Sequence, residues 1–147
     1  MVNPAIEGKV YPRTESYLVG REKIREFAKA VFSKDPANLE LDAAKKLGYK
    51  DLIAPPTFAV VIQERSLHQV ITDKQAALDF SRVVHGDQRF IHVRPICAGD
   101  ELTSELKVAS VKQLAGNSMV SFETQIFDAN QDLVCTAIST LVVRGAS

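Results

Sequence analysis

Few side chains in this sequence have the chemistry of a catalyst, and the most suggestive pair is His85 and Asp87. They flank Gly86 in the segment VVHGDQRF. Residues two apart in a strand point to the same face, so the imidazole could act as a base that the carboxylate orients. With Ser33 the pair could also form a nucleophilic set. The alternative is a histidine in a loop or at the start of a strand, with its ring nitrogens satisfied by hydrogen bonds.

A second candidate carboxylate lies in the first third of the chain. Asp35 directly precedes Pro36 in the segment SKDPAN. An aspartate at this place is typical of a turn or of the N-cap of a helix. The alternative is that the Asp35 carboxylate does acid–base work.

The remaining histidines and the two cysteines indicate neither a metal site nor a redox centre. We expect His92 in a half-buried strand and His68 at the polar end of a helix, and the histidines have no ligand spacing. Cys97 and Cys135 are far apart and lie in no CxxC motif. They are therefore expected to be two small buried apolar side chains, and we expect no metal and no cofactor.

The composition is that of one ordinary globular domain, which we expect to span residues 1–147. The chain has a mass of 16.2 kDa, with 46% hydrophobic and 24% charged residues. Its 18 basic residues balance 18 acidic ones, so it lacks the excess of cations that a nucleic-acid-binding protein needs. It shows no apolar run long enough to cross a membrane and no leader pattern, which predicts a cytoplasmic protein. A neutral surface also suits a chain that buries part of itself in a partner.

Three segments of the first half have helical patterns. The segment 21–32 carries one apolar stripe, 39–48 is a short helix that ends at a glycine, and 57–71 begins almost wholly apolar and becomes polar. Two consecutive prolines, Pro55 and Pro56, allow the last of these helices to begin only at about Pro56. This helix is therefore expected to be buried at its first end and exposed at its second.

The second half alternates apolar and polar residues, the pattern of β-strands. We expect a short strand at 17–19 and four long ones at 89–96, 101–114, 118–127 and 133–143, the last three joined by hairpin turns. An apolar sheet face must be covered, and the helix 57–71 is the obvious cover. The predicted fold is therefore α+β, a single hot-dog domain with an antiparallel sheet wrapped around a central helix. An open α+β sandwich of another topology and a small barrel are the alternatives.

Three segments together resemble a known family. They are YLVGREKIREFAKAV (17–31), LGYKDLIAPPTF (47–58) and VVHGDQRFIHVRPICAGDEL (83–102). The chain is similar, over roughly residues 10–144, to the MaoC-like hot-dog dehydratases and (R)-specific enoyl hydratases. Within that family it most resembles the accessory subunits of heterodimeric (3R)-hydroxyacyl-ACP dehydratases, including those of mycolic-acid-type fatty acid elongation. The resemblance implies a lyase of fatty acid metabolism that acts on an acyl thioester.

The active members of that family carry the motif Asp-x-Asn-Pro-x-His, and this sequence departs from it. Aligned on Pro36, Ser33 stands at the Asp position and Asn38 at the His position, while Asp35 stands at the Asn position. Moving a proton at Cα and a water oxygen at Cβ requires groups that can gain and lose protons. The side chains of serine and asparagine do not titrate near neutral pH, so this chain lacks the usual catalytic pair.

The expected binding site for the thioester also departs from the family. Where active relatives have a His-Gly-Met-like stretch whose glycine N–H polarises the thioester, this chain has Pro55, Pro56 and Thr57. Proline has no N–H, so only the N–H of Thr57 could take its place. The resemblance implies that the residues that contact substrate are Pro56, Thr57, Phe58, His85 and Gln88.

Three functions are compatible with these observations. The first is a subunit of a (3R)-hydroxyacyl-thioester dehydratase or hydratase, acting on acyl-CoA or acyl-ACP, in which a second hot-dog chain supplies the Asp and His. The second is a hot-dog thioesterase that uses His85 and Asp87. The third is a non-catalytic homodimer that binds acyl thioesters. Neither nucleic acid nor a membrane is expected as a partner.

Overall fold

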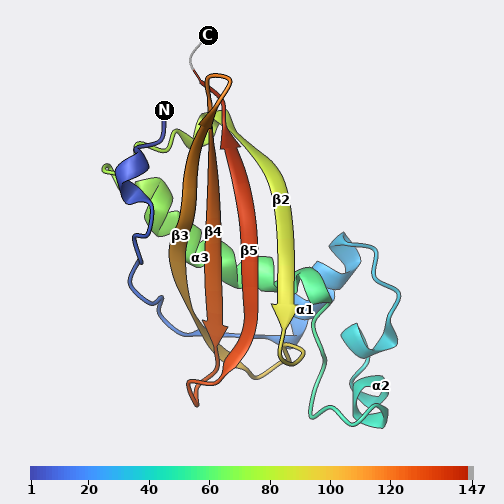
Figure 1. Ribbon diagram of the computed structural model, residues 1–147. Coiled ribbons are helices and arrows are strands. Elements are labelled where there is room, and N and C mark those ends of the chain that lie inside the picture. The colour runs from blue at the N-terminus through green and yellow to red at the C-terminus, as the bar shows by residue number, and fades with distance from the viewer. Residues whose placement is uncertain (146–147) are drawn as a thin grey trace.

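A five-stranded antiparallel sheet curls around one long helix in the computed structural model, which describes residues 1–145 (Figure 1). The strand order is β1-β3-β4-β5-β2, so β1 and β2 form the two edges. This arrangement confirms the hot-dog fold expected from the sequence. The strands are β1 (Tyr17–Leu18), β2 (Val83–His92), β3 (Glu101–Leu114), β4 (Asn117–Phe127) and β5 (Leu133–Val143).

The central helix α3 (Ala59–Thr72) lies across the concave face of the sheet (Figure 1). A single 3-10 turn, η3 (Pro56–Phe58), precedes it and begins at the second of the two prolines, as expected. The buried side chains of α3 form one stripe that faces β3, β4 and β5. They are Ala59, Ile62, Gln63, Ser66 and Val70.

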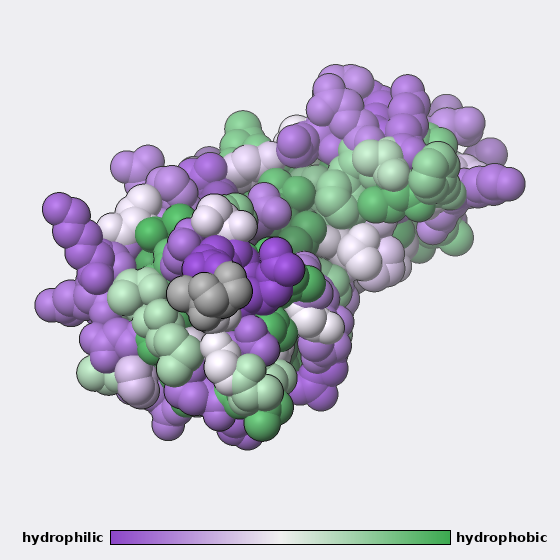
Figure 2. All heavy atoms as spheres, turned by 90° about the horizontal axis from the view of Figure 1, so that it is seen from above, coloured by the Kyte–Doolittle hydropathy of each residue, from purple (hydrophilic) through white to green (hydrophobic). Residues whose placement is uncertain are grey.

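A helical lobe lies beyond the β2 edge of the sheet, on the right of Figure 1. It contains α1 (Arg21–Ala30), the 3-10 turn η2 (Pro36–Asn38) and α2 (Leu41–Lys46). Helix α1 was expected to continue to Phe32 but ends at Ala30, because Phe32 adopts a left-handed backbone with φ of +58°. Apolar residues gather on the surface of this lobe (Figure 2), and Val31, Phe32 and Leu47 are exposed.

The core fills the space between α3 and the sheet, and the strand alternation predicted it well. Leu102, Leu106 and Val108 of β3 are fully buried, as are Val120, Phe122, Thr124 and Ile126 of β4. At the first end of α3, the ring of Phe58 meets that of Phe27 edge to face at 5.3 Å. Two further 3-10 turns are η1 (Pro4–Ile6), whose Ile6 is buried in the core with Val70 of α3, and η4 (Phe80–Arg82).

Strand β2 differs from the expectation, because it begins at Val83 rather than at residue 89 and ends at His92 rather than at residue 96. Gly86 is the extra residue of a β-bulge. His85 pairs with Leu141 and Asp87 pairs with the adjacent Thr140, so Gly86 has no partner of its own in β5. A Cβ atom on Gly86 would lie 3.2 Å from the Thr140 carbonyl oxygen, so any larger residue here would require the backbone of β5 to shift slightly. The glycine and its polar neighbours therefore belong to a bulged strand rather than to a loop. Within residues 1–145, no helix has both the length and the apolarity to cross a bilayer.

Candidate functional site

The residues at the family's Asp and His positions are bonded to each other. The Ser33 hydroxyl donates to Asn38 Oδ1 at 2.7 Å, and Asn38 Nδ2 donates to the Ile53 carbonyl oxygen at 2.8 Å. Asn38 is only 3% exposed, so its amide is held in this orientation. Asp35 caps the turn η2, accepting from the Ala37 N–H at 3.0 Å. The Asp and His positions of the motif are thus occupied by an uncharged, hydrogen-bonded pair, Ser33 and Asn38, and the only carboxylate of the motif positions, Asp35, caps the turn.

A cavity of about 310 Å³ lies where the helical lobe, the start of η3 and the end of β2 meet. Asp35 and Asn38 line it from the lobe, and Pro56 lines it from the start of η3. His92 and the residues that follow it form the opposite wall. This first cavity therefore contains two of the three motif positions and one of the five residues expected to contact substrate. Its remaining lining residues are Ile53, Ala54, Val93, Arg94, Pro95 and Ile96.

His92 was expected to be a half-buried strand residue, but it is exposed and lines the first cavity. Its Nε2 lies 2.8 Å from the Pro56 carbonyl oxygen. A carbonyl oxygen only accepts, so Nε2 is the donor in this contact. One sequence pattern could have placed His92 at this cavity. Alternate residues of a strand share a face, and the face of β2 that meets the central helical segment carries Gln88, Phe90 and His92.

The arginine in the wall of the first cavity is already neutralised. Arg94 Nη1 donates to Asp100 Oδ2 at 2.8 Å, and its Nη2 donates to Asp128 Oδ2 at 3.2 Å. The hydrogen bond to Asp100 raises the pKa of the guanidinium. The Asp100 carboxylate is 4% exposed and also accepts from the Cys97 N–H at 2.8 Å. These charges therefore hold the loop before β3 in place and are not free to bind a substrate anion.

Both cysteines are buried and free, as expected. Burial raises the pKa of Cys97, and it raises that of Cys135 to about 11. Both thiols are therefore protonated at neutral pH, and neither is a nucleophile. Among residues 1–145, no three His, Cys, Asp or Glu side chains converge as metal ligands.

A second cavity, of about 260 Å³, lies between α3 and the strands β2 and β5. His85 and Gln88, both expected to contact substrate, line it. Gln63 and Ser139, which the sequence did not single out, line it as well. Thr57 and Phe58 line neither of these two cavities. Thr57 is exposed, and Phe58 is buried in the core.

His85 and Asp87 do not share a face, contrary to expectation. The bulge at Gly86 pairs His85 with Leu141, whose side chain is buried, and pairs Asp87 with Thr140 on the outer face. The imidazole meets only the backbone of Asp87, with Nε2 3.1 Å from its carbonyl oxygen. The carboxylate therefore does not orient the imidazole.

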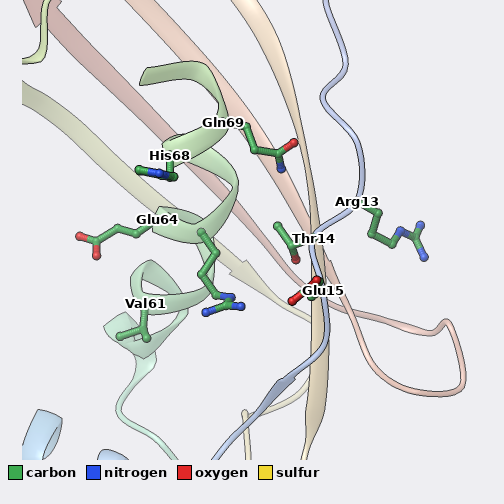
Figure 3. Close-up of a pocket in the computed structure, with 8 residues that line it drawn as sticks. Arg13, Thr14, Glu15, Val61, Glu64, His68 and Gln69 are labelled. Atoms are coloured by element: carbon green, nitrogen blue, oxygen red, sulfur yellow. The ribbon is translucent and has the colours of Figure 1, made fainter. Parts of the chain in front are cut away.

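A third cavity, of about 650 Å³, lies on the other side of α3, against the segment that precedes β1. In Figure 3, Arg13 points away from the helix, while Glu64 and His68 project from its other flank. The Arg13 guanidinium instead stacks on the ring of Phe127 at 4.1 Å. Arg13 thus points away from Glu64 and His68 in this cavity, so we take the two smaller cavities as the candidate site.

Comparison with known proteins decides the family. The family described as "FAS1-like, dehydratase domain region" matches residues 5–137. The chain belongs to the MaoC-like, FAS1-type dehydratase family of hot-dog proteins. A UPF0336 protein of Leifsonia xyli subsp. xyli is 56% identical over 144 residues, which cover 98% of this chain and 97% of that protein.

Two solved structures of this dehydratase family resemble the chain along most of its length. One is the HadBC (3R-hydroxyacyl-ACP dehydratase) complex of Mycobacterium tuberculosis, with 32% identity and a TM-score of 0.83. The match covers 93% of this chain and 96% of the matched chain. The other is a MaoC-like dehydratase with 30% identity and a TM-score of 0.85, whose match covers 97% of this chain but 43% of its own.

Proposed function

We propose that this chain is one subunit of a (3R)-hydroxyacyl-thioester dehydratase or hydratase. It contributes the acyl channel, while a second hot-dog chain supplies the catalytic Asp and His. The observation that carries the proposal is the 2.7 Å hydrogen bond between Ser33 and Asn38. These two residues stand where active relatives have the catalytic Asp and His, and their side chains do not titrate near neutral pH. The substrate is an acyl group on CoA or ACP, and the proposed location is the cytoplasm.

The reaction needs a proton removed from Cα and the hydroxyl at Cβ protonated as it leaves as water. An acid–base pair close to both carbons is required, and a donor must stabilise the negative charge on the thioester oxygen. In this chain the exposed first turn of the central helix offers the N–H of Thr57, while Pro56 has none. The chain's own contribution is therefore a place for the acyl group rather than the proton transfer.

The free edge of the sheet favours a paired assembly. In the described part of the chain β2 pairs only with β5, which leaves its other edge open for a second chain. Val84, Ile91 and Val93 on or beside this strand are 49%, 58% and 66% exposed. The matched HadBC structure is a complex, and the matched MaoC-like dehydratase has more than twice the matched length. Both support pairing with a second hot-dog unit, and pairing with a second copy is the alternative.

The test is to purify the chain alone and together with a co-encoded hot-dog chain that carries the intact Asp-x-Asn-Pro-x-His motif. Hydration of crotonyl-CoA and of longer enoyl-CoA substrates is followed by the loss of enoyl absorbance. We expect activity only in the pair. Full activity of the lone chain that is lost in Asp35→Ala or His92→Ala would overturn the proposal, because it would place the acid–base pair in this chain. Acyl-CoA hydrolysis lost in His85→Ala would point to a thioesterase instead.

A further inference from the structure

Three polar side chains form a hydrogen-bonded bridge across the second cavity. Gln88 Nε2 donates to Gln63 Oε1 at 2.9 Å, and Gln63 Nε2 donates to Ser139 Oγ at 3.0 Å. The bridge thus joins one side chain from β2, one from the central helix and one from β5. Gln63 and Ser139 are each 3% exposed and Gln88 is half-buried, so the bridge is buried at its Gln63–Ser139 end and partly open at Gln88.

The walls around this bridge are mostly apolar, and Glu64 and His85 are the ionisable residues among them. Because a hydrocarbon offers no hydrogen bond, any alkyl group that displaces one of these amides leaves the other without a partner in a buried place. An alkyl group that stops short of the bridge meets no such penalty and still buries its surface against the apolar walls. The apolar lining residues are Val60, Leu67, Phe80, Val83 and Leu141.

The bridge lies along the same side of the central helix as the first cavity. The face of β2 that meets the helix presents His92 at the first cavity and Gln88 at the second, with Phe90 between them. Along the helical segment, Pro56 borders the first cavity and Gln63 the second. An acyl chain whose thioester lies near Pro56, and whose tail follows the helix, therefore runs toward the bridge.

We infer that the Gln63–Gln88–Ser139 bridge closes the acyl channel and sets the length of acyl group that this chain accepts. The inference rests on the proposed function, since it takes the two cavities as parts of one acyl site. Groups that end before the bridge bind well. Longer groups have to break the Gln63–Gln88 hydrogen bond and bind less tightly than their added apolar surface would otherwise allow.

The test compares saturated acyl-CoA probes of increasing length, namely butyryl-, octanoyl-, dodecanoyl- and palmitoyl-CoA. Their dissociation constants for the isolated chain are measured by calorimetry for the wild type and for Gln63→Leu and Gln88→Leu, which replace the amide by an apolar group of similar size. We expect the palmitoyl-to-octanoyl affinity ratio to rise about tenfold in each variant, which corresponds to about 1.4 kcal/mol.

Two matched controls separate the bridge from general effects of the substitutions. Gln125→Leu makes the same change on the outer face of β4. Ser139→Ala is added as a third bridge variant, and Ser121→Ala is its control, because Ser121 bonds Thr140 on that outer face. Both controls should leave the length profile unchanged. Thermal melts of every variant identify any that fails to fold, and the remaining bridge variants then carry the comparison.

The enoyl-CoA hydration assay on the paired protein separates the two proposals. Hydration by the pair with a length profile that the bridge variants do not change overturns the inference and leaves the proposed function standing. No hydration, together with a binding profile that the variants lengthen, supports the inference and overturns the proposed function. If the chain binds no acyl-CoA and the pair hydrates none, both proposals are overturned.

Discussion

Phe32 gives an unusual stability prediction, because its backbone is strained and its ring has few contacts within the chain. Its φ is +58° and its side chain is 88% exposed. The Phe32 N–H donates to the Lys29 carbonyl at 3.1 Å, and the Ser33 N–H donates to the Ala28 carbonyl at 2.8 Å. These two bonds form a Schellman ending for α1, in which glycine is the usual residue at the position of Phe32.

The substitution Phe32→Gly should therefore stabilise the isolated chain. A left-handed backbone costs an L-residue about 1–2 kcal/mol, whereas glycine lowers stability by about 0.4–1 kcal/mol through the greater freedom of the unfolded chain. At the middle of both ranges, Phe32→Gly raises the free energy of unfolding by about 0.8 kcal/mol. For a chain of this size the gain corresponds to a rise in Tm of about 2–3 °C.

The matched variant is Phe32→Ala, which keeps the left-handed backbone and removes the ring. It should stay within about 0.5 kcal/mol of the wild type, because an exposed ring stabilises the fold little. Urea denaturation of the three proteins measures both differences. A Phe32→Gly chain that is less stable than the wild type would refute the reasoning, since it would mean that the ring packs within the folded chain.

Two further predictions concern the core and the N-terminal segment. Phe58→Ala should lower the free energy of unfolding by about 3–5 kcal/mol in urea denaturation, because Phe58 is fully buried, and a loss below about 1 kcal/mol would contradict the packing at the start of the central helix. Asp73 accepts from Lys9 Nζ at 2.6 Å and from the Tyr11 hydroxyl at 2.7 Å, which lowers its pKa from 3.8 to about 2. The contribution of Asp73 to the free energy of unfolding is therefore present above about pH 4 and is lost as the pH falls toward 2. Asp73→Asn should make the free energy of unfolding depend less on pH in this range. An unchanged dependence would count against this role of Asp73.

The sequence predicted the architecture because the main elements repeat simple patterns. Alternation along β3 and β4 identified the buried face, and the two prolines located the start of the central helix. The start of β2 was missed, because Gly86 and its polar neighbours resemble a loop in a local view. The end of α1 was placed two residues too late, because Phe32 takes a left-handed backbone that the sequence does not announce.

The sequence predicted only those parts of the candidate site whose residues lie close together in the chain. The motif alignment brought out Ser33 and Asn38, which the structure joins by a hydrogen bond. The bridge between Gln63 and Ser139 joins residues 76 positions apart, and no local pattern links them. The sequence also did not predict that His92 lines the first cavity, because its partner is the carbonyl oxygen of Pro56, 36 positions away.

The central claim, that this chain needs acid–base groups from a second hot-dog chain, is tested most directly by titration. A hot-dog chain from the same genome that carries an intact Asp-x-Asn-Pro-x-His motif is added in steps to a fixed amount of this chain while crotonyl-CoA hydration is followed. The account predicts no activity at the start and a rise that saturates at equimolar subunits, even with Asp35→Ala in this chain. Substituting the Asp or His of the added subunit should abolish the rise. Full activity before any partner is added would contradict the account.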